Sequence, residues 1–383
     1  MAKAYLDYNA TTPIEPRVYE SMVPYIKESF GNPSSIHSFG SIAKSALDNT
    51  RDKVGELINC SSSEIIFTTG GSESNNFAIK GIISYYGNNK KTHLITTKVE
   101  HASCLETYRF FENCGYRVTY LNVDEQGLID CNELKDSLNE DTLLVSVIYA
   151  NNETGVLSPI GKIAQIVKER GTLFHTDAVQ AVGKEKIDLQ NIPVDLMSFS
   201  GHKLYGPKGV GALFVRKGID ITPLVHGGGQ ERGRRSGTEN VPAIVGFGSA
   251  CEIARNEYIE ENNRVKLLRD ELQRKIEKSI NNVRLNGHPH MRLSNTLNMS
   301  IQGVEGDALV MNLDLEGYAV STGSACSEGN IDPSHVLLAM GLSEEEAKSS
   351  LRISLGKFTT NEEIQSLVSI LPKIVDRVRN SEI

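Results

Sequence analysis

One lysine, Lys203, stands where a reactive amine is expected. It follows an apolar run at Asp195–Phe199 that predicts a buried strand, and the stretch SFSGHKLYGPKGVG surrounds it with small residues and turn formers. Most lysines keep the ammonium group in water, but a lysine at a strand end can point into a crevice, where burial lowers the pKa of an amine and makes it nucleophilic. Such an amine can form a Schiff base with a carbonyl substrate or with pyridoxal phosphate. The alternative is a surface lysine that closes a tight turn.

A phosphate site is predicted after the apolar run at Glu64–Thr69. Gly70, Gly71 and Ser72 follow this strand and open a helix. Bare backbone amides at a helix N-terminus, with a hydroxyl group beside them, bind phosphate. Glycine-rich turns between strands and helices are common, so this signal is weak when it stands alone.

Further polar residues follow the other predicted strands. They are Glu100 and His101, then 151–153, then Asp177 and Gln180, and then Ser200 and His202. Each has a structural alternative, such as a polar loop, a helix cap or a histidine without a catalytic role. The carboxyl ends of parallel strands meet at one edge of a sheet, so together these residues place an amine, a phosphate cradle, an acid and an imidazole along one rim. Pyridoxal phosphate requires a lysine, a phosphate cradle and a carboxylate for its pyridinium nitrogen.

Two other cofactor classes fit the sequence less well. It contains no Gly-x-Gly-x-x-Gly motif of the kind that binds dinucleotides. The spacing Gly206-x-x-x-x-Gly211 is followed by Ala212 and Leu213, whereas a nucleoside triphosphate loop continues with lysine and a hydroxyl residue.

A second reactive centre is predicted at Cys326, in the stretch STGSACSEG. The small polar residues on both sides favour an exposed thiol, whereas the other five cysteines lie in apolar or helical patterns that favour packing. A free thiol has a pKa of about 8.5, so a nearby positive charge would be needed to give much thiolate at neutral pH. The alternative is an unreactive loop cysteine.

The composition argues against several classes of protein. The net charge of −8 disfavours non-specific binding to nucleic acids or to anionic membranes. No apolar run approaches the length of about 18 residues that a membrane span needs, and the first residues lack a secretory signal. Six cysteines without a Cys-x-x-Cys pair indicate a reducing compartment, the cytoplasm, and no structural zinc.

The alternation of short apolar runs with helical patterns predicts an α/β fold. The expected strands of the main sheet are 64–69, 93–99, 117–123, 143–149, 172–175, 195–199 and 210–215. Strands that read as apolar runs between helices favour a mostly parallel sheet covered by helices on both faces.

The length of 383 residues allows two domains. A long helical pattern at Pro242–Ile280 leads to a smaller region with predicted strands at Asn295–Ile301, Ala308–Leu313 and Leu351–Ser354. We therefore expect a large domain over residues 15–255. Residues 1–14 and 256–383 would form a small α+β domain that carries the loop of Cys326.

In their order along the chain, these motifs resemble the cysteine desulfurases of the NifS/IscS type. The matching stretches are DYNATTP, FGNPSSIHSFG, TTGGSESNN, VEHAS, ANNETG, HTDAVQ, SFSGHKLYGPKGVG, GGGQERGRRSGTEN, STGSACSEG and LRISLG. That family belongs to the class V aminotransferase branch of the fold-type I pyridoxal phosphate enzymes. The resemblance implies that pyridoxal phosphate is the cofactor and that L-cysteine is converted to L-alanine, with a persulfide formed on Cys326. It also implies a homodimer and a sulfur acceptor such as an iron–sulfur scaffold protein.

The resemblance implies a role for each matched residue. The cofactor-binding set would be Gly71, Ser72, His101, Asn151, Asp177, Gln180, Ser200, His202, Lys203 and Thr238. Lys203 would bind the cofactor covalently, Asp177 would pair with the pyridinium nitrogen, and Gln180 would donate to the ring hydroxyl. His101 would stack on the ring and assist proton transfer.

Other implied roles concern the substrate and the second subunit. Asn151 and Arg352 would lie around the substrate, and Arg352 would bind its carboxylate as a bidentate guanidinium. Cys326 would be the nucleophile, and Thr238 would reach the phosphate from the partner subunit. No resident metal is expected, apart from a transient ligation of an iron–sulfur cluster by Cys326.

Two features depart from the family pattern. Ser72 stands where threonine is usual, which preserves the hydroxyl group. The sequence ends at Ile383, soon after a predicted helix at Asn361–Arg379, whereas longer relatives dock the scaffold through a C-terminal tail. The rival functions are a selenocysteine lyase, a small-substrate aminotransferase, and a non-catalytic dimeric scaffold.

Overall fold

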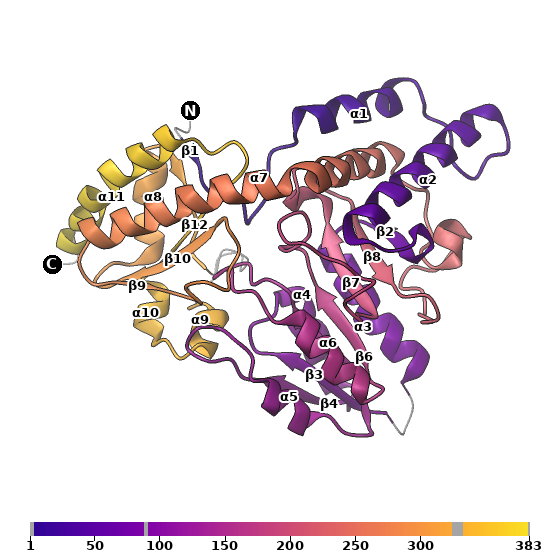
Figure 1. Ribbon diagram of the computed structural model, residues 1–383, viewed down its shortest axis with the longest axis horizontal. Coiled ribbons are helices and arrows are strands. Elements are labelled where there is room, and N and C mark those ends of the chain that lie inside the picture. Colours follow the sequence, from indigo (N-terminus) through magenta and orange to yellow (C-terminus); the bar gives the residue numbers. More distant parts are fainter. Residues whose placement is uncertain (1–3, 88–90, 324–331, 382–383) are drawn as a thin grey trace.

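The computed structural model describes residues 4–87, 91–323 and 332–381. The predicted nucleophile Cys326 therefore lies outside the described residues. Two sheets organise the fold, and one long helix runs past both of them (Figure 1).

The larger sheet has seven strands among the described residues. They are β2 (Ile65–Thr68), β3 (His93–Thr97), β4 (Arg117–Leu121), β5 (Thr142–Ile148), β6 (Leu173–Asp177), β7 (Leu196–Ser200) and β8 (Gly211–Val215). Their order is β2-β8-β7-β6-β5-β3-β4, and only β8 is antiparallel to its neighbours. The prediction of a mostly parallel sheet is confirmed.

Helices cover both faces of this sheet (Figure 1). On one face lie α3 (Gly71–Tyr86) and α4 (Ala102–Asn113); towards the other lie α1 (Pro16–Lys27), α2 (Ser38–Ile58), α5 (Cys131–Ser137), α6 (Ile160–Glu169) and the start of α7 (Val241–Ser279). Successive strand residues point to opposite faces. In β8, Leu213 and Val215 join the core beneath α3, whereas Ala212 and Phe214 join the core on the other face. Strands that are buried on both faces, such as β5 and β8, carry apolar residues on both faces for this reason.

The smaller sheet is antiparallel and has the order β12-β10-β9. Its strands are β9 (Val283–Leu285), β10 (Thr296–Ile301) and β12 (Ser350–Ser354), and a separate parallel pair is formed by β1 (Ala4–Tyr5) and β11 (Tyr318–Ala319). The nearby helices are α8 (Gly306–Leu315), α9 (His335–Ala339), α10 (Glu344–Lys348) and α11 (Asn361–Ser381). The hydrophobic core of this region includes Leu272 and Ile276 of α7 and also Ala4 and Leu6 of the N-terminal arm.

The predicted strand at Ala308–Leu313 is wrong, because these residues lie within α8. Leu309 and Leu313 are fully buried, whereas Met311 between them is 67% exposed. Burial therefore recurs every four residues, the helical spacing, rather than every two. Gly317, at φ +90°, follows the last turn and ends the helix in a left-handed conformation.

The long helix α7 takes part in both hydrophobic cores. Val241 and Phe247 pack with the larger sheet, and Val265 packs with the smaller one. The predicted domain boundary after residue 255 falls inside this continuous helix. Among the described residues, no helix is both long enough and apolar enough to cross a bilayer.

Candidate active site

A cavity of about 250 Å³ opens where the parallel strands β5, β6 and β7 end. The structure brings most of the predicted site residues to its wall. They are Gly71, Ser72, His101, Asp177, Gln180, Ser200, His202, Lys203 and Arg352. The expectation that polar residues after separate strands meet at one rim is met.

Lys203 is the last residue of the single turn η2 (Gly201–Lys203), which directly follows β7. Gly201 permits this turn, because a Cβ atom there would lie 3.1 Å from both Phe247 and Val210. The Lys203 Nζ atom donates to the backbone carbonyl oxygens of Asn9 and Ala10, at 2.7 Å for Ala10. The N-terminal arm thus contacts the amine at the cavity wall.

The N-terminus of α3, where a phosphate site is predicted, lies at the cavity. No described side chain caps this helix, and its N-cap Gly70 has φ +151°, a conformation that favours glycine. The hydroxyl oxygen of Ser200, which faces Gly70, is buried and has no hydrogen-bond partner among the described residues. Free helix amides and an orphaned hydroxyl fit a phosphate group.

His202 completes this side of the cavity. Its Nδ1 atom lies 3.2 Å from Thr11 Oγ1. Burial, and then the neighbouring Lys203 ammonium, lower the pKa of His202 to about 4. A neutral imidazole at pH 7 can donate a hydrogen bond to an anion from one ring nitrogen while the other nitrogen accepts one.

Asp177 is the last residue of β6 and is 3% exposed. Its Oδ2 atom accepts a hydrogen bond from Asn75 Nδ2 at 2.6 Å, and its Oδ1 atom accepts one from the Val179 N–H at 3.0 Å. Both oxygens act as acceptors, as expected of a carboxylate. A carboxylate in this wall fits a pyridinium nitrogen.

Gln180 is held from both ends of its amide. Its Nε2 atom donates to the Asn9 carbonyl oxygen at 2.9 Å, and its Oε1 atom accepts from Lys184 Nζ at 3.0 Å. Burial lowers the pKa of Lys184 to about 7. These two bonds fix the amide group of Gln180, which lines the cavity.

Arg352 lies on β12 of the smaller sheet and is 2% exposed. Its Nη2 atom donates to Asp7 Oδ1 at 2.9 Å and its Nη1 atom donates to the Asn152 carbonyl oxygen at 3.2 Å. Its Nε atom is buried without a partner among the described residues. A guanidinium group with spare donors suits a carboxylate ligand.

Two predicted residues, Asn151 and Thr238, are not brought into this wall, and a third lies outside the described residues. The side chain of Asn151 bonds to the Val99 carbonyl oxygen and to the N–H groups of Glu153 and Thr154, so it shapes the loop, and Asn152 faces the cavity instead. Thr238 is exposed on the loop between β8 and α7. Cys326 falls outside the described residues, between Gly323 and Asp332.

The sequence reasoning missed four residues that contact this site. Asp7 and Asn9 lie in the arm stretch DYNATTP, and Asn75 and Ser103 lie in TTGGSESNN and VEHAS. All four lie within motifs that carry the resemblance, and this was the available signal.

The fold and the cavity define an enzyme of the class V aminotransferase family, to which this chain belongs. The family model described as Aminotransferase class-V matches residues 4–367. The family uses pyridoxal phosphate, and the N-terminus of α3, the carboxylate of Asp177 and the amine of Lys203 fit that cofactor.

Within this family, the chain belongs with the cysteine desulfurases of the IscS/NifS type. It is 48% identical over 377 residues to a cysteine desulfurase IscS of Dictyoglomus turgidum, which covers 98% of this chain and 95% of the relative. A solved NifS-like protein is 39% identical, with a TM-score of 0.93 and coverage of 98% of this chain and 100% of that one. A solved structure of SspA in complex with cysteine is 38% identical, with a TM-score of 0.81 and coverage of 93% and 99%.

Proposed function

We infer that this chain is a pyridoxal phosphate-dependent cysteine desulfurase that uses Cys326 as its sulfur-accepting nucleophile. It would convert L-cysteine to L-alanine and leave a persulfide on Cys326. The observation that carries this proposal is the convergence of Lys203, Asp177 and Arg352 on one cavity: an amine, an acid and a carboxylate-binding guanidinium.

Each residue of the cavity would have a separate role. When bound, pyridoxal phosphate supplies an electron sink for the substrate amino acid. Lys203 would hold the cofactor, the N-terminus of α3 with Ser200 and His202 would bind its phosphate group, and Asp177 would face the pyridinium nitrogen. Arg352 would orient the substrate carboxylate, and His101 would assist proton transfer.

Cys326 would carry the sulfur-transfer step. Its thiolate would attack the sulfur atom of the substrate, forming a sulfur–sulfur bond while the carbon–sulfur bond breaks. The electron pair of the broken bond would return to the carbon skeleton, which takes up a proton and leaves as alanine. A thiolate is required because the thiol form is a poor nucleophile.

We also propose that the enzyme is a homodimer in which Thr238 of one subunit completes the phosphate site of the other. The exposure of Thr238 outside the cavity of its own chain supports this role. The five described cysteines are free thiols, which supports the proposal that the protein works in the cytoplasm. An iron–sulfur scaffold protein is the proposed acceptor of the persulfide.

Two variants test the assignment. Lys203→Ala should abolish both the visible absorbance of the bound cofactor and alanine formation from L-cysteine. Cys326→Ala should keep the absorbance band but lose transfer of sulfur to an acceptor protein. Full transfer by Cys326→Ala would refute the nucleophile assignment.

Product analysis separates the proposed activity from its rivals. A cysteine desulfurase forms alanine and sulfane sulfur from L-cysteine alone, whereas an aminotransferase needs an added keto acid. A selenocysteine lyase would turn over only the selenium analogue. A non-catalytic scaffold would remain colourless after reconstitution with pyridoxal phosphate.

A further inference from the structure

A hydrogen-bonded chain joins His101 to Asp177 through two side chains that no role above requires. Ser103 Oγ lies 2.8 Å from His101 Nδ1. Asn75 Nδ2 lies 2.9 Å from Ser103 Oγ and 2.6 Å from Asp177 Oδ2. His101 is the N-cap of α4, Ser103 lies in its first turn, Asn75 lies on α3, and Asp177 ends β6.

The direction of each hydrogen bond can be assigned from the donors. The backbone N–H of Ser103 donates to His101 Nδ1 at 3.1 Å, and an amide N–H cannot accept. His101 Nδ1 must therefore present its lone pair. Asn75 uses its amide hydrogens on Asp177 and Ser103, so the Ser103 hydroxyl accepts from Asn75 and donates its own proton to His101 Nδ1.

We propose that Ser103 and Asn75 are positioning residues that fix His101 as the neutral tautomer with its proton on Nε2 and that link this choice to Asp177. The inference rests on the proposed function, because it assigns a protonation state to the histidine expected to assist proton transfer. A proton added to Nδ1 would face two hydrogen-bond donors, the Ser103 hydroxyl and the Ser103 backbone N–H. The backbone N–H cannot become an acceptor. His101 is thereby held as an Nε2–H donor rather than as an imidazolium.

Burial supports a fixed arrangement. Asn75 is 1% exposed and Asp177 is 3% exposed, so water does not compete for the bonds between them. Among the described residues, the charged and titratable groups around His101 include Asp177, His202, Lys203 and Arg352 in the cavity wall, with Glu100, Glu153 and His335 nearby. All of them remain in a Ser103 variant, so a change in His101 can be assigned to the lost hydroxyl.

The test is NMR of the holoenzyme labelled with ¹³C,¹⁵N-histidine, with the His101 signals assigned from a His101→Gln variant. We expect an unprotonated Nδ1 and a protonated Nε2 at pH 7. In Ser103→Ala, the loss of one donor on Nδ1 should raise the pKa of His101 by about 0.5–1 pH unit. Ser103→Thr is the matched control and should restore the wild-type value.

Two further readouts sharpen the test. The acid limb of the kcat pH profile should move with the pKa of His101 in Ser103→Ala, and Asn75→Ala should produce a similar shift that does not add to it in the double variant. His175, whose pKa burial lowers to about 3, provides an internal reference for a neutral imidazole.

Three results would overturn the proposal: an Nδ1–H tautomer or an imidazolium in the wild type at pH 7, an unchanged His101 pKa in Ser103→Ala, or additive shifts in the double variant. The wild-type tautomer is informative even if a variant fails to fold. The NMR result also does not depend on which substrate is turned over, so a failure of the proposed desulfurase activity would be recognised separately, by the absence of alanine.

Discussion

At the scale of single residues, Glu100 is an acid buried next to the site, with no opposing charge paired to it among the described residues. Its Oε1 atom accepts from Thr97 Oγ1 at 2.7 Å and from the Ile148 N–H at 2.8 Å. Its Oε2 atom is buried without a partner among the described residues. Burial is the largest cause that raises the pKa of Glu100 to about 8. Between about pH 4.5 and pH 8, the native protein therefore keeps a proton on Glu100 that the unfolded chain releases.

Glu100→Gln should remove a pH dependence of stability. The native pKa of Glu100 lies above its unfolded value, so this group lowers the free energy of unfolding as the pH rises from about 4.5 to 8. The free energy of unfolding of the variant, measured relative to that of the wild type, should therefore rise by about 2–4 kcal/mol between pH 5 and pH 8. Urea denaturation at both pH values measures this difference.

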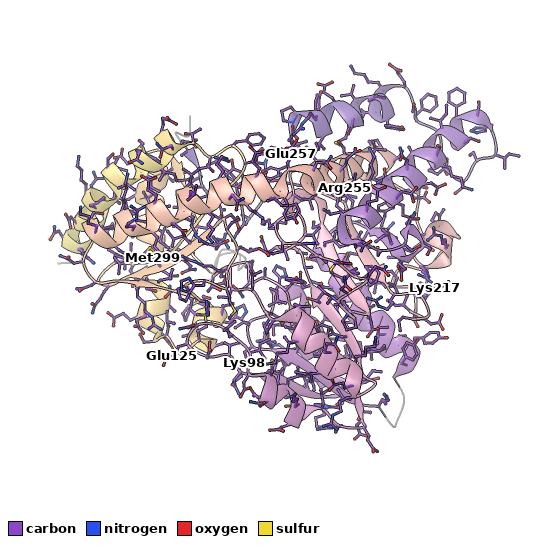
Figure 2. All side chains as sticks on the ribbon, in the orientation of Figure 1. Lys98, Glu125, Lys217, Arg255, Glu257 and Met299 are labelled. Atoms are coloured by element: carbon purple, nitrogen blue, oxygen red, sulfur yellow. The ribbon has the colours of Figure 1, made fainter. Side chains whose placement is uncertain are left out.

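The matched control is Glu125→Gln. Glu125 is exposed and lies at the periphery of the molecule (Figure 2). The free energy of unfolding of Glu125→Gln should therefore change with pH as that of the wild type does. If the free energies of unfolding of the wild type and of Glu100→Gln change in parallel from pH 5 to pH 8, Glu100 is ionised in the native protein.

The sequence predicts part of this site because of how the chain is connected. Lys203, Asp177 and His101 each come soon after a strand of a mostly parallel sheet, so their convergence follows from the fold. Asn9 could not be predicted in the same way. It reaches Lys203 through an arm that is fixed by Thr296 of the smaller sheet and by the preceding residue Asn295, and no local pattern specifies that path.

At the scale of elements, a buried ion pair fixes the loop between β8 and α7. Arg51 of α2 binds Glu231 through two hydrogen bonds of 2.7 and 2.8 Å, and Glu231 Oε2 also accepts from the Phe67 N–H at 2.9 Å. Glu231 and Arg232 have left-handed φ angles of 46° and 58°, which non-glycine residues adopt only when their surroundings impose them. The ion pair supplies that restraint.

Arg51→Met should destabilise the protein because it leaves the Glu231 carboxylate buried and unpaired. Breaking a buried pair from one side costs about 3–5 kcal/mol. The chain contains no tryptophan, so urea unfolding is best followed by far-ultraviolet circular dichroism. The control Arg109→Met breaks the exposed pair with Glu106, which should cost less than about 1 kcal/mol. Equal decreases in the free energy of unfolding of the two variants would contradict the assigned role of Arg51.

Predictability also differs between elements. Most strands of the larger sheet could be predicted because both of their faces are buried, which favours apolar residues on both faces; the partly exposed edge strand β4 is the exception. The residues Ala308–Leu313 form a mostly apolar run too, but they lie in helix α8. Only one face of this helix is buried, so Met311 on its other face is exposed. A short apolar run does not distinguish these two cases without the tertiary structure.

At the scale of the whole molecule, the two sheets are joined on more than one side. Helix α7 contributes to both cores, and Glu257 near its middle pairs with Arg17 of α1 and with Lys357, which follows β12 (Figure 2). The Asp7–Arg352 pair connects the arm to the smaller sheet at the cavity. The site is therefore assembled from both regions, and its geometry depends on how they pack.

Several exposed apolar side chains lie on and beside α1 and the start of α2, which project beyond the larger sheet (Figure 1). The exposed side chains there are Ile14, Tyr19, Ile26, Phe30, Ile36, Phe39 and Ile42. Phe30 is 77% exposed and Ile36 is fully exposed. Extended apolar patches on a protein surface mark interaction sites, and the proposed homodimer offers a second copy of this chain as the partner.

The double variant Phe30→Asp/Ile36→Asp should shift the protein from dimer to monomer, because two carboxylates would have to be buried without partners in the interface. Sedimentation velocity over a range of protein concentrations measures this shift. If Thr238 of the partner completes the phosphate site, the monomer should also bind pyridoxal phosphate at least about tenfold more weakly, a loss of roughly 1.4 kcal/mol. The control Leu315→Asp alters a side chain that is 85% exposed on α8 and should leave both the dimer and the cofactor affinity unchanged. A monomeric wild type that binds the cofactor fully would exclude a contribution of Thr238 from a second subunit.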